Sequence, residues 1–499
     1  MSGEKLFSII GLVDDGLIEE AEDGRPARKK MKKIRMKWAA AACVVIVIGS
    51  GIWYIGRHGI LPPSSGSGGS GHAEGSSFMH YAGPILPLNA AGNTDGITAS
   101  RSIDFDFAAS VTGQNNLLIT DTYTLTNNTA ADKTIDTFYP FISSITESAR
   151  FTPKLAADGK VLKTELLIGD YSGGFTGVYG AGGPGNSTYN LAHINSWEGY
   201  KVLLENGKYF ETARGEKTSS DQKVTVYTFH DVAYPEGYDA ATLAIEFDLP
   251  QGSSVITYGI NGASFGEGNH RIYDYFVRHS SGQRIIFLGE PPAKYKVQGY
   301  ENGACEKKVD GIKASVKKEE MLLSEVIHDC MADHMEKYIT SDGISPLVTE
   351  EHLFRAVVSM FEYTSLGNEP KDRYDWIRLD DLIGESCVMD RIMYLKAQVT
   401  IPAGQSIEFE SKFEKGASYD FAGAGSKENQ GVKGYDIMTK LGSNLKFSGQ
   451  RAGINLPQTY EIVRQNFGFD PSNGVTEVSL DMAQERYYLE IKAKSAAAR

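Results

Sequence analysis

The sequence predicts a mainly β protein, with two antiparallel β-sandwich-like units, the second carrying a helical insertion, behind a single N-terminal transmembrane helix. An uncharged run, residues 38–56, follows a strongly basic stretch. Short segments with period-2 alternation, bounded by Gly, Asn and Pro, fill most of the remaining chain. The 54 Gly, 26 Tyr and 22 Phe favour strands joined by glycine turns over helical bundles.

Residues 38–56 are predicted to cross a lipid bilayer. Their 19 residues carry no charge, and a helix of that length spans a hydrocarbon core of about 30 Å. Eight Lys/Arg lie from Arg25 to Lys37, whereas Arg57 is the one charge before Glu74. The positive-inside rule therefore places the N-terminus in the cytoplasm and the body outside. The late start of the basic region disfavours a cleaved signal peptide.

The cytoplasmic segment 1–37 combines an amphipathic stretch with the basic run. One helical face carries its apolar residues, which are Leu6, Ile9, Ile10, Val13 and Leu17. A helix this short needs a cover for that face. Seven acidic residues disfavour an anionic membrane surface, so we expect these side chains to bind a cytoplasmic protein. The alternative is a disordered tail held near the bilayer.

The body follows a flexible Gly/Ser-rich linker, 57–77. We expect a β-rich domain at 78–295 and a second β-rich domain at 296–495, with the helical insertion near 317–365. The Gly66, Gly68 and Gly71 pattern in the linker is no dinucleotide motif, because no strand precedes it and no helix follows.

The first domain is predicted from short alternating runs. Residues 115–128 and the KTIDTFYPFI run indicate a hairpin, and further strands are expected at 223–232, 242–250, 254–261, 271–279 and 283–290. In the second domain, helices are expected at 317–339 and 349–363, followed by strands within 393–413 and 476–493.

Charge and cysteine content exclude some partners. Residues 1–37 carry nine basic and seven acidic residues, so the remaining chain holds 41 basic and 56 acidic ones, a net charge of −15. Nucleic acid and anionic lipid surfaces would repel this body. Cys305, Cys330 and Cys387 fit no zinc pattern; buried thiols are expected, and a Cys305–Cys330 or Cys330–Cys387 bridge is the alternative.

No catalytic constellation is expected, and neither a metal nor another cofactor. Gly262–Gly266 matches G-x-S-x-G around Ser264, but an alternating segment follows where a nucleophile elbow requires a helix. His328 and His334 are six residues apart and do not share a helical face. The Asp/Arg-rich stretch 371–381 is expected to be a salt-bridged loop.

The glycine-rich segment 170–190, which runs on to Trp197 and Tyr200, is the best candidate for ligand binding outside the membrane. Loops that combine aromatic rings with Asn and Ser are typical of recognition surfaces, where rings stack on sugars or peptides. A cell-wall saccharide is the expected ligand, and a long loop with incidental tyrosines is the alternative. The candidate residues are Tyr171, Tyr179, Tyr189, Trp197 and Tyr200.

KLFSIIGLVDDGLIEEAE, the basic run and KWAAAACVVIVIG together resemble the front end of single-pass membrane proteins of clostridial Firmicutes, whose cytoplasmic segment is similar to that of anti-sigma-type regulators. GYDIMTKLGSNLKFSGQRAGINLP and the segments after it resemble the closing β-unit of uncharacterised ectodomains from these Gram-positive bacteria. The resemblance implies a sigma factor as the inner partner. It implies no enzymatic activity.

Two functions are therefore expected. The first is a membrane-anchored extracytoplasmic sensor or binding protein that acts as an anti-sigma-like regulator. The second is a cell-surface adhesion or carbohydrate-binding module with a passive anchor. An envelope enzyme would require Ser264 to act as a nucleophile.

Overall fold

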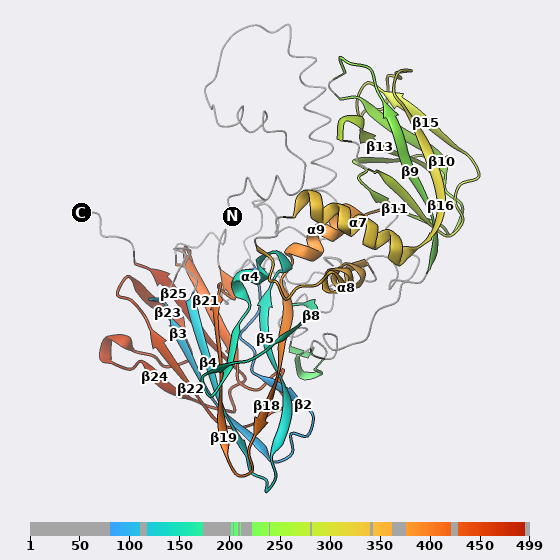
Figure 1. The fold of residues 1–499 in the computed structure, drawn as a ribbon. Helices are drawn as coiled ribbons and strands as arrows, with labels where there is room; N and C mark the ends of the chain where they lie inside the picture. Colours follow the sequence, from blue (N-terminus) through green and yellow to red (C-terminus); the bar gives the residue numbers. More distant parts are fainter. Residues whose placement is uncertain are drawn as a thin grey trace, which may run out of the picture. The chain divides into compact units, whose positions relative to one another are not determined.

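The computed structural model (Figure 1) describes residues 80–109, 117–172, 201–202, 204–207, 210, 222–238, 240–279, 282–339, 343–361, 376–420 and 428–494. This part of the chain is mainly β, with several antiparallel sheets, as the sequence predicts. None of its helices has the length and apolar character that membrane crossing requires. The predicted cytoplasmic segment 1–37 and transmembrane helix 38–56 lie outside the described residues.

The chain divides into two compact units, and each is built from segments that are not continuous in sequence. Unit 1 takes its described residues from Thr218–Thr340 and Val357–Ser386. Unit 2 takes its described residues from His58–Lys217, Ser341–Ala356 and Cys387–Arg499. Unit 1 is thus an insertion within unit 2 along the sequence.

This division differs from the boundary that the sequence predicts between residues 295 and 296. In unit 1, β16 (Lys313–Leu322) pairs antiparallel with β9 (Lys223–Ala233). In unit 2, β18 (Arg391–Ile401) pairs along its whole length with β5 (Lys133–Ser143). Pairing of strands distant in sequence decides which segments belong together, and local composition carries no sign of it.

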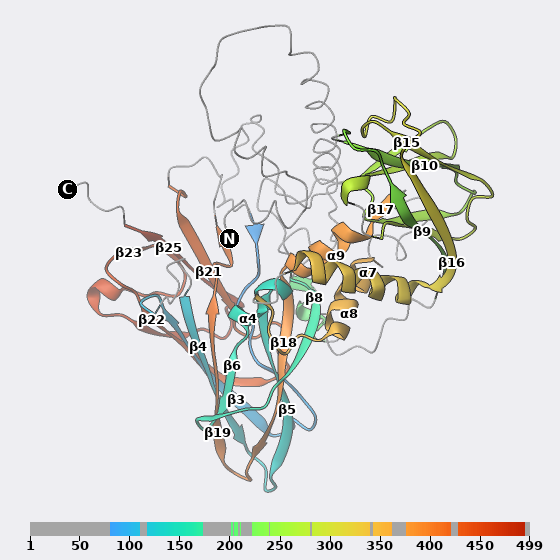
Figure 2. The ribbon, with the colours of Figure 1, turned by 45° about the horizontal axis from the view of Figure 1, so that its top comes forward.

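Unit 2 contains three sheets (Figures 1 and 2). The seven-stranded sheet has the order β24 (Glu477–Leu480), β22 (Lys446–Asn455), β3 (Ile97–Asp106), β4 (Leu117–Asn127), β19 (Ser406–Lys415), β6 (Lys154–Ala157) and β7 (Lys160–Val161). The four-stranded sheet has the order β2 (Asn89–Ala91), β5, β18 and β8 (Glu165–Tyr171). The five-stranded sheet has the order β1 (His80–Tyr81), β20 (Tyr419–Asp420), β21 (Val432–Met438), β25 (Arg486–Ala493) and β23 (Tyr460–Gln465).

One core joins these sheets, because each strand buries one of its two faces. In β4 the side chains of Ile119, Tyr123 and Leu125 are fully buried, whereas the Thr residues between them point outward. The same core contains Met393 of the four-stranded sheet and Leu489 of the five-stranded sheet. The buried face of the seven-stranded sheet therefore packs on the buried faces of the other two.

The predicted strands β4 and β5 exist, but the predicted hairpin is wrong, because the two strands belong to different sheets. The connection between them is an arch organised by Asn127, whose side chain is completely buried. Its amide donates to Ala131 O at 2.8 Å and Ile401 O at 3.0 Å, and its Oδ1 accepts from Thr129 N at 3.0 Å. These bonds satisfy backbone groups that a hairpin ladder would have paired.

Unit 1 packs two sheets face to face around a second core. The five-stranded sheet has the order β16, β9, β14 (Arg284–Leu288), β11 (Ser254–Tyr258) and β17 (Trp376–Arg378). The four-stranded sheet has the order β12 (Gly262–Phe265), β13 (His270–Phe276), β10 (Thr242–Asp248) and β15 (Tyr295–Tyr300). Phe287 and Tyr273 represent the two sheets in the core.

Helices are few among the described residues. Those with complete bounds are α4 (Ser148–Phe151), α7 (Leu323–Tyr338), α8 (Glu350–Phe361) and α9 (Leu379–Val388), with short 3-10 turns at Ile145–Glu147, Val277–His279 and Pro471–Asn473. The helix predicted at 349–363 is α8.

Two predictions are wrong in part: one about where a helix begins, and one about a salt-bridged loop. The helix expected from residue 317 begins at Leu323, because the residues before it extend β16, and the Leu322 N–H donates to Glu325 Oε2 at 3.0 Å. Within the expected loop 371–381, the described residues form β17 and the start of α9. Arg378 contacts Asp380 and Asp381 at the start of this helix. Acidic residues are stabilising at a helix N-terminus because of the helix dipole.

Candidate functional site

A buried lysine ends the inward-facing row of β19. Ile407, Phe409 and Phe413 precede Lys415 in this row, and Lys415 is only 8% exposed. Its Nζ donates to Gly83 O at 3.1 Å. Burial lowers the pKa of Lys415, and the nearby carboxylates of Asp436 and Asp390 oppose that change.

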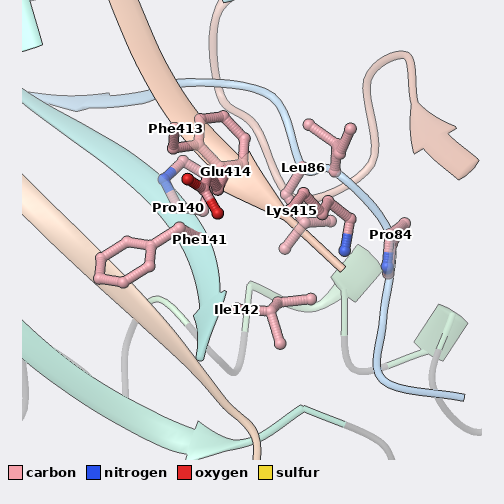
Figure 3. A pocket seen from close by; sticks show the side chains of 9 residues that line it. Pro84, Leu86, Pro140, Phe141, Ile142, Phe413, Glu414 and Lys415 are labelled. Atoms are coloured by element: carbon pink, nitrogen blue, oxygen red, sulfur yellow. The ribbon is translucent and has the colours of Figure 1, made fainter. Parts of the chain in front are cut away.

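Lys415 also lines a small cavity, in which Figure 3 shows side chains of β19 together with side chains of the segment before β2. Apart from Lys415 and Glu414, the lining residues are apolar. They are Pro84, Ile85, Leu86, Pro140, Phe141, Ile142 and Phe413. The cavity volume of about 10 Å³ suits one water molecule. An organic substrate does not fit, so Lys415 acts here as a structural cation.

Two buried carboxylates, Asp436 and Glu490, lie on the paired strands β21 and β25. The Asp436 side chain is completely buried, and its Oδ2 accepts from Arg486 Nε at 2.9 Å. The Glu490 side chain is 3% exposed, accepts from Arg464 Nε, and accepts from Tyr419 Oη at 3.1 Å. Burial, together with both carboxylates, raises the pKa of Tyr419. We call these five residues the Arg/Glu face.

Gly434 makes the Arg/Glu face possible. It lies opposite both Tyr419 and Glu490 in the sheet. A Cβ at this position would come within 2.1 Å of the Tyr419 ring. Only glycine therefore lets the ring lie flat across β21 and reach the Glu490 carboxylate.

The chemistry of the Arg/Glu face favours neutral polar ligands. The guanidinium side chains of Arg464 and Arg486 are 34% and 30% exposed, and each is paired with a buried carboxylate. This pairing cancels most of the charge of the guanidinium N–H donors, and Arg464 Nη2 also donates to Asn429 Oδ1 at 2.7 Å. Such donors form charge-assisted hydrogen bonds with hydroxyl or carbonyl oxygens.

The predicted ligand-binding segment is anchored on unit 2. Tyr171 is the last residue of β8 and pairs with Arg391, whereas Tyr179, Tyr189, Trp197 and Tyr200 lie outside the described residues. Beyond them, Lys201 Nζ contacts Glu485 Oε2 at 2.6 Å. Glu485 immediately precedes Arg486, so the segment returns to the body beside the Arg/Glu face.

Further packing secures this return. Leu204 is 3% exposed, and the Phe210 ring lies 4.9 Å from the Phe138 ring and 5.5 Å from the Tyr394 ring. Leu204 and these partners belong to or pack on a small apolar cluster of unit 2. The end of the segment therefore has a defined position. The predicted cytoplasmic contact residues, Leu6, Ile9, Ile10, Val13 and Leu17, lie outside the described residues.

The serine-hydrolase arrangement around Ser264 is absent from the structure. Ser264 lies in β12, opposite Ile272 of β13, so a strand follows the motif where catalysis would need a helix. His270 Nδ1 contacts Asp248 Oδ1 at 3.0 Å on an exposed edge. The G-x-S-x-G match is thus a hairpin, as its alternation predicts.

The metal-ligand and cysteine candidates from the sequence are also placed by the structure. Among the described residues, no three His, Cys, Asp or Glu side chains are grouped to hold a metal ion. His334 is buried on α7, and burial lowers its pKa. Cys305, Cys330 and Cys387 are free thiols, so neither bridge considered from the sequence is present. Cys330 and Cys387 are buried as expected, whereas Cys305 is partly exposed, which corrects the expectation for this thiol.

The Arg/Glu face was not identified from the sequence. The alternation of Arg486, Tyr488 and Glu490 along β25 is visible there, but alternating polar residues usually mark a solvated strand face. Their burial depends on β20 and β23, which pair only in the folded chain.

Comparisons of the chain with protein-family models, with curated proteins and with solved structures found no match.

Proposed function

We propose that the protein is a single-pass, membrane-anchored binding protein whose β-sandwich-like body senses a ligand outside the membrane, and whose cytoplasmic helix holds an inner partner in an anti-sigma-like manner. The observation that carries this proposal is the uncharged run 38–56 directly after eight basic residues. The body is compatible with it, because its described residues form mainly β units.

Protease protection tests the topology. In intact protoplasts, added protease should digest the body and spare an epitope in residues 1–37. Val45→Arg/Val47→Arg should release the protein from the membrane, because an arginine at the bilayer centre costs about 2.5–3.5 kcal/mol on insertion scales. A body protected from protease, or wild-type protein in the soluble fraction, would contradict the proposed topology.

Binding to a purified sigma factor tests the inner contact. Residues 1–37 should capture a sigma factor from the host, and Ile10→Asp/Leu17→Asp should abolish capture by placing charges on the apolar helix face. Asp15→Asn/Glu19→Gln, on the opposite face, is the matched control and should retain binding. Equal capture by both double variants would refute a contact through Leu6, Ile10, Val13 and Leu17.

A carbohydrate-binding module is the second candidate, and the Arg/Glu face favours it. Charge-compensated guanidiniums suit sugar hydroxyls, and the aromatic residues that the sequence predicts for ligand binding suit sugar rings. The full-length protein should bind a cell-wall saccharide, and Trp197→Ala should weaken binding at least tenfold. Tyr234→Ala removes an exposed aromatic ring of unit 1 and serves as the control. Absence of binding across a glycan panel would exclude this function.

A further inference from the structure

Asp274 is a buried carboxyl group on what should be a solvated sheet face. It lies in β13, opposite Ala244 of β10 and Gly262 of β12, in the four-stranded sheet of unit 1. Strands β13 and β10 are labelled in Figure 1. Its neighbours Tyr273 and Tyr275 point into the core, so Asp274 points away from it. Asp274 is nevertheless only 8% exposed. Some other part of the chain must therefore cover it.

The cover is the loop 301–308, which follows β15. Its ends are joined by a hydrogen bond from Glu301 N to Lys307 O at 2.9 Å, and Cys305 N donates to Asn302 O at 3.2 Å. Cys305 has a φ of +54°, a left-handed conformation that is uncommon for a residue other than Gly, Asn or Asp. The loop is thus a compact turn with local backbone strain.

The loop and the sheet meet at two glycines. A Cβ on Gly303 of the loop would come within 3.7 Å of the Phe276 ring and 4.0 Å of Asp274 Oδ1. A Cβ on Gly262 would lie 2.4 Å from Asp274 Oδ2. The carboxyl group is therefore enclosed by glycine backbone from the loop and from β12, and neither glycine offers a side chain to pair with it.

The groups facing Asp274 do not compensate a negative charge. From the loop, Cys305 faces it, and burial beside Asp274 and Glu246 raises the pKa of this thiol to about 12. From β10, Glu246 is already paired with Tyr300 Oη at 2.7 Å and lies 3.6 Å from Lys296 Nζ.

The Asp274 side chain itself has no hydrogen-bond or ion-pair partner in the part of the chain that the structure describes, and burial alone raises its pKa to about 7. Its enclosure is therefore compatible with a neutral carboxyl group and costly for an ionised one.

We propose that the loop 301–308 is a pH-dependent cover, closed while the Asp274 carboxyl is protonated and opening as that carboxyl ionises, so that Cys305, which is partly exposed in the closed loop, becomes more accessible. Opening would expose the carboxylate, which is 8% exposed in the closed loop, more fully to water. This device does not depend on membrane anchoring or on the inner partner, so its failure would leave the proposed function standing.

Proton linkage gives the size of the effect. A carboxyl that ionises near pH 4 when solvated and near pH 7 when enclosed releases one proton on opening between those values. The opening equilibrium constant should therefore rise about tenfold per pH unit from pH 4 to pH 7, and level off above pH 7.

Amide hydrogen exchange in residues 301–308 of the full-length protein in detergent micelles tests the cover. After correction for the intrinsic pH dependence of exchange, wild-type protection should fall about tenfold per pH unit up to pH 7. Asp274→Asn should show constant protection over this range. Asp248→Asn is the matched control, because Asp248 is on the same sheet face with its side chain 86% exposed, and it should behave as wild type. A flat wild-type profile, or an equal slope in Asp274→Asn, would overturn the proposal.

Alkylation at a fixed pH of 7.5 is a second, independent measurement. Cys305 should be modified at least tenfold faster in wild type than in Asp274→Asn. Cys330, which is 0% exposed and belongs to the same unit as the loop, reports unfolding of unit 1 in the same sample. Modification of Cys305 only together with Cys330 would also overturn the proposal, because opening would then be unfolding of unit 1.

Discussion

At the scale of single residues, the buried Asp121 carboxylate of unit 2 is stabilised by complete pairing. The Arg101 guanidinium binds both oxygens of Asp121, each at 2.8 Å, inside the core. Tyr123 and Tyr139 each donate a hydroxyl to Asp121 Oδ2 at 2.9 Å. Because every oxygen of the carboxylate has donors, the network specifies one arrangement of β3, β4 and β5 without leaving an unpaired buried charge.

Asn127 is the residue on which the β4–β5 connection depends most. Asn127→Ala should lower the free energy of unfolding by about 2–4 kcal/mol, because it leaves several buried backbone groups without partners. Chemical denaturation of the full-length protein measures this change. Asn128→Ala, at the exposed neighbouring position, should cost less than about 1 kcal/mol. Equal effects of the two substitutions would show that the arch does not depend on the Asn127 amide.

His334 should make stability depend on pH in unit 1. Neither ring nitrogen has a hydrogen bond in the described part of the chain, and burial lowers the pKa of His334 although Asp380 and Asp333 oppose this. The folded state therefore keeps the ring neutral, whereas the unfolded chain binds a proton below about pH 6.5. Protonation thus favours unfolding, and the contribution of His334 to stability falls as the pH drops below that value.

His334→Leu should remove this pH dependence. Its unfolding free energy relative to wild type should rise by at most about 1.4 kcal/mol per pH unit below pH 6.5. Urea unfolding at pH 7.5 and pH 5.0 gives the double difference, and His230→Gln, at an exposed position on β9, is the control. A constant difference between wild type and His334→Leu at the two pH values would contradict this account.

At the scale of secondary structure elements, strands were predictable because their signal is local. Alternation along β4, β9 and β19 is visible in sequence, and the structure has strands at these positions. The start of α7 was misjudged, because Lys317–Leu322 suits a charged helix as well as it suits the edge strand β16. Only hydrogen bonding to β9 separates the two outcomes.

The attachment of α7 to β11 should depend on one hydrogen bond. Tyr258 Oη donates to Asp333 Oδ2 at 2.5 Å, and Lys337 Nζ contacts the other oxygen at 2.6 Å. Tyr258→Phe should lower the unfolding free energy by about 1.5–3 kcal/mol, as for other bonds to charged groups. Hydrogen exchange in α7 should increase in parallel. Tyr234→Phe alters a hydroxyl on an exposed ring and should change neither quantity.

At the scale of the whole molecule, the two units have separate cores, so we expect two unfolding transitions. Phe409→Ala in unit 2 and Ile285→Ala in unit 1 each empty a fully buried position. Each should destabilise its own unit by about 2–5 kcal/mol and leave the midpoint of the other transition unchanged. Scanning calorimetry measures the midpoint of each unfolding transition in each variant. A single transition that both variants shift equally would mean that the units unfold together.

The sequence by itself determined the mainly β class, the positions of most strands, the helix at α8 and the hairpin around Ser264. These features follow from alternation, turn residues and helical periodicity, which act over a few neighbouring residues. The tertiary structure alone decided the assignment of β4 and β5 to different sheets, the insertion of unit 1 within unit 2, the Arg/Glu face and the enclosure of Asp274. Each of these depends on contacts between residues distant in the chain, and such contacts leave no periodic pattern in a single sequence.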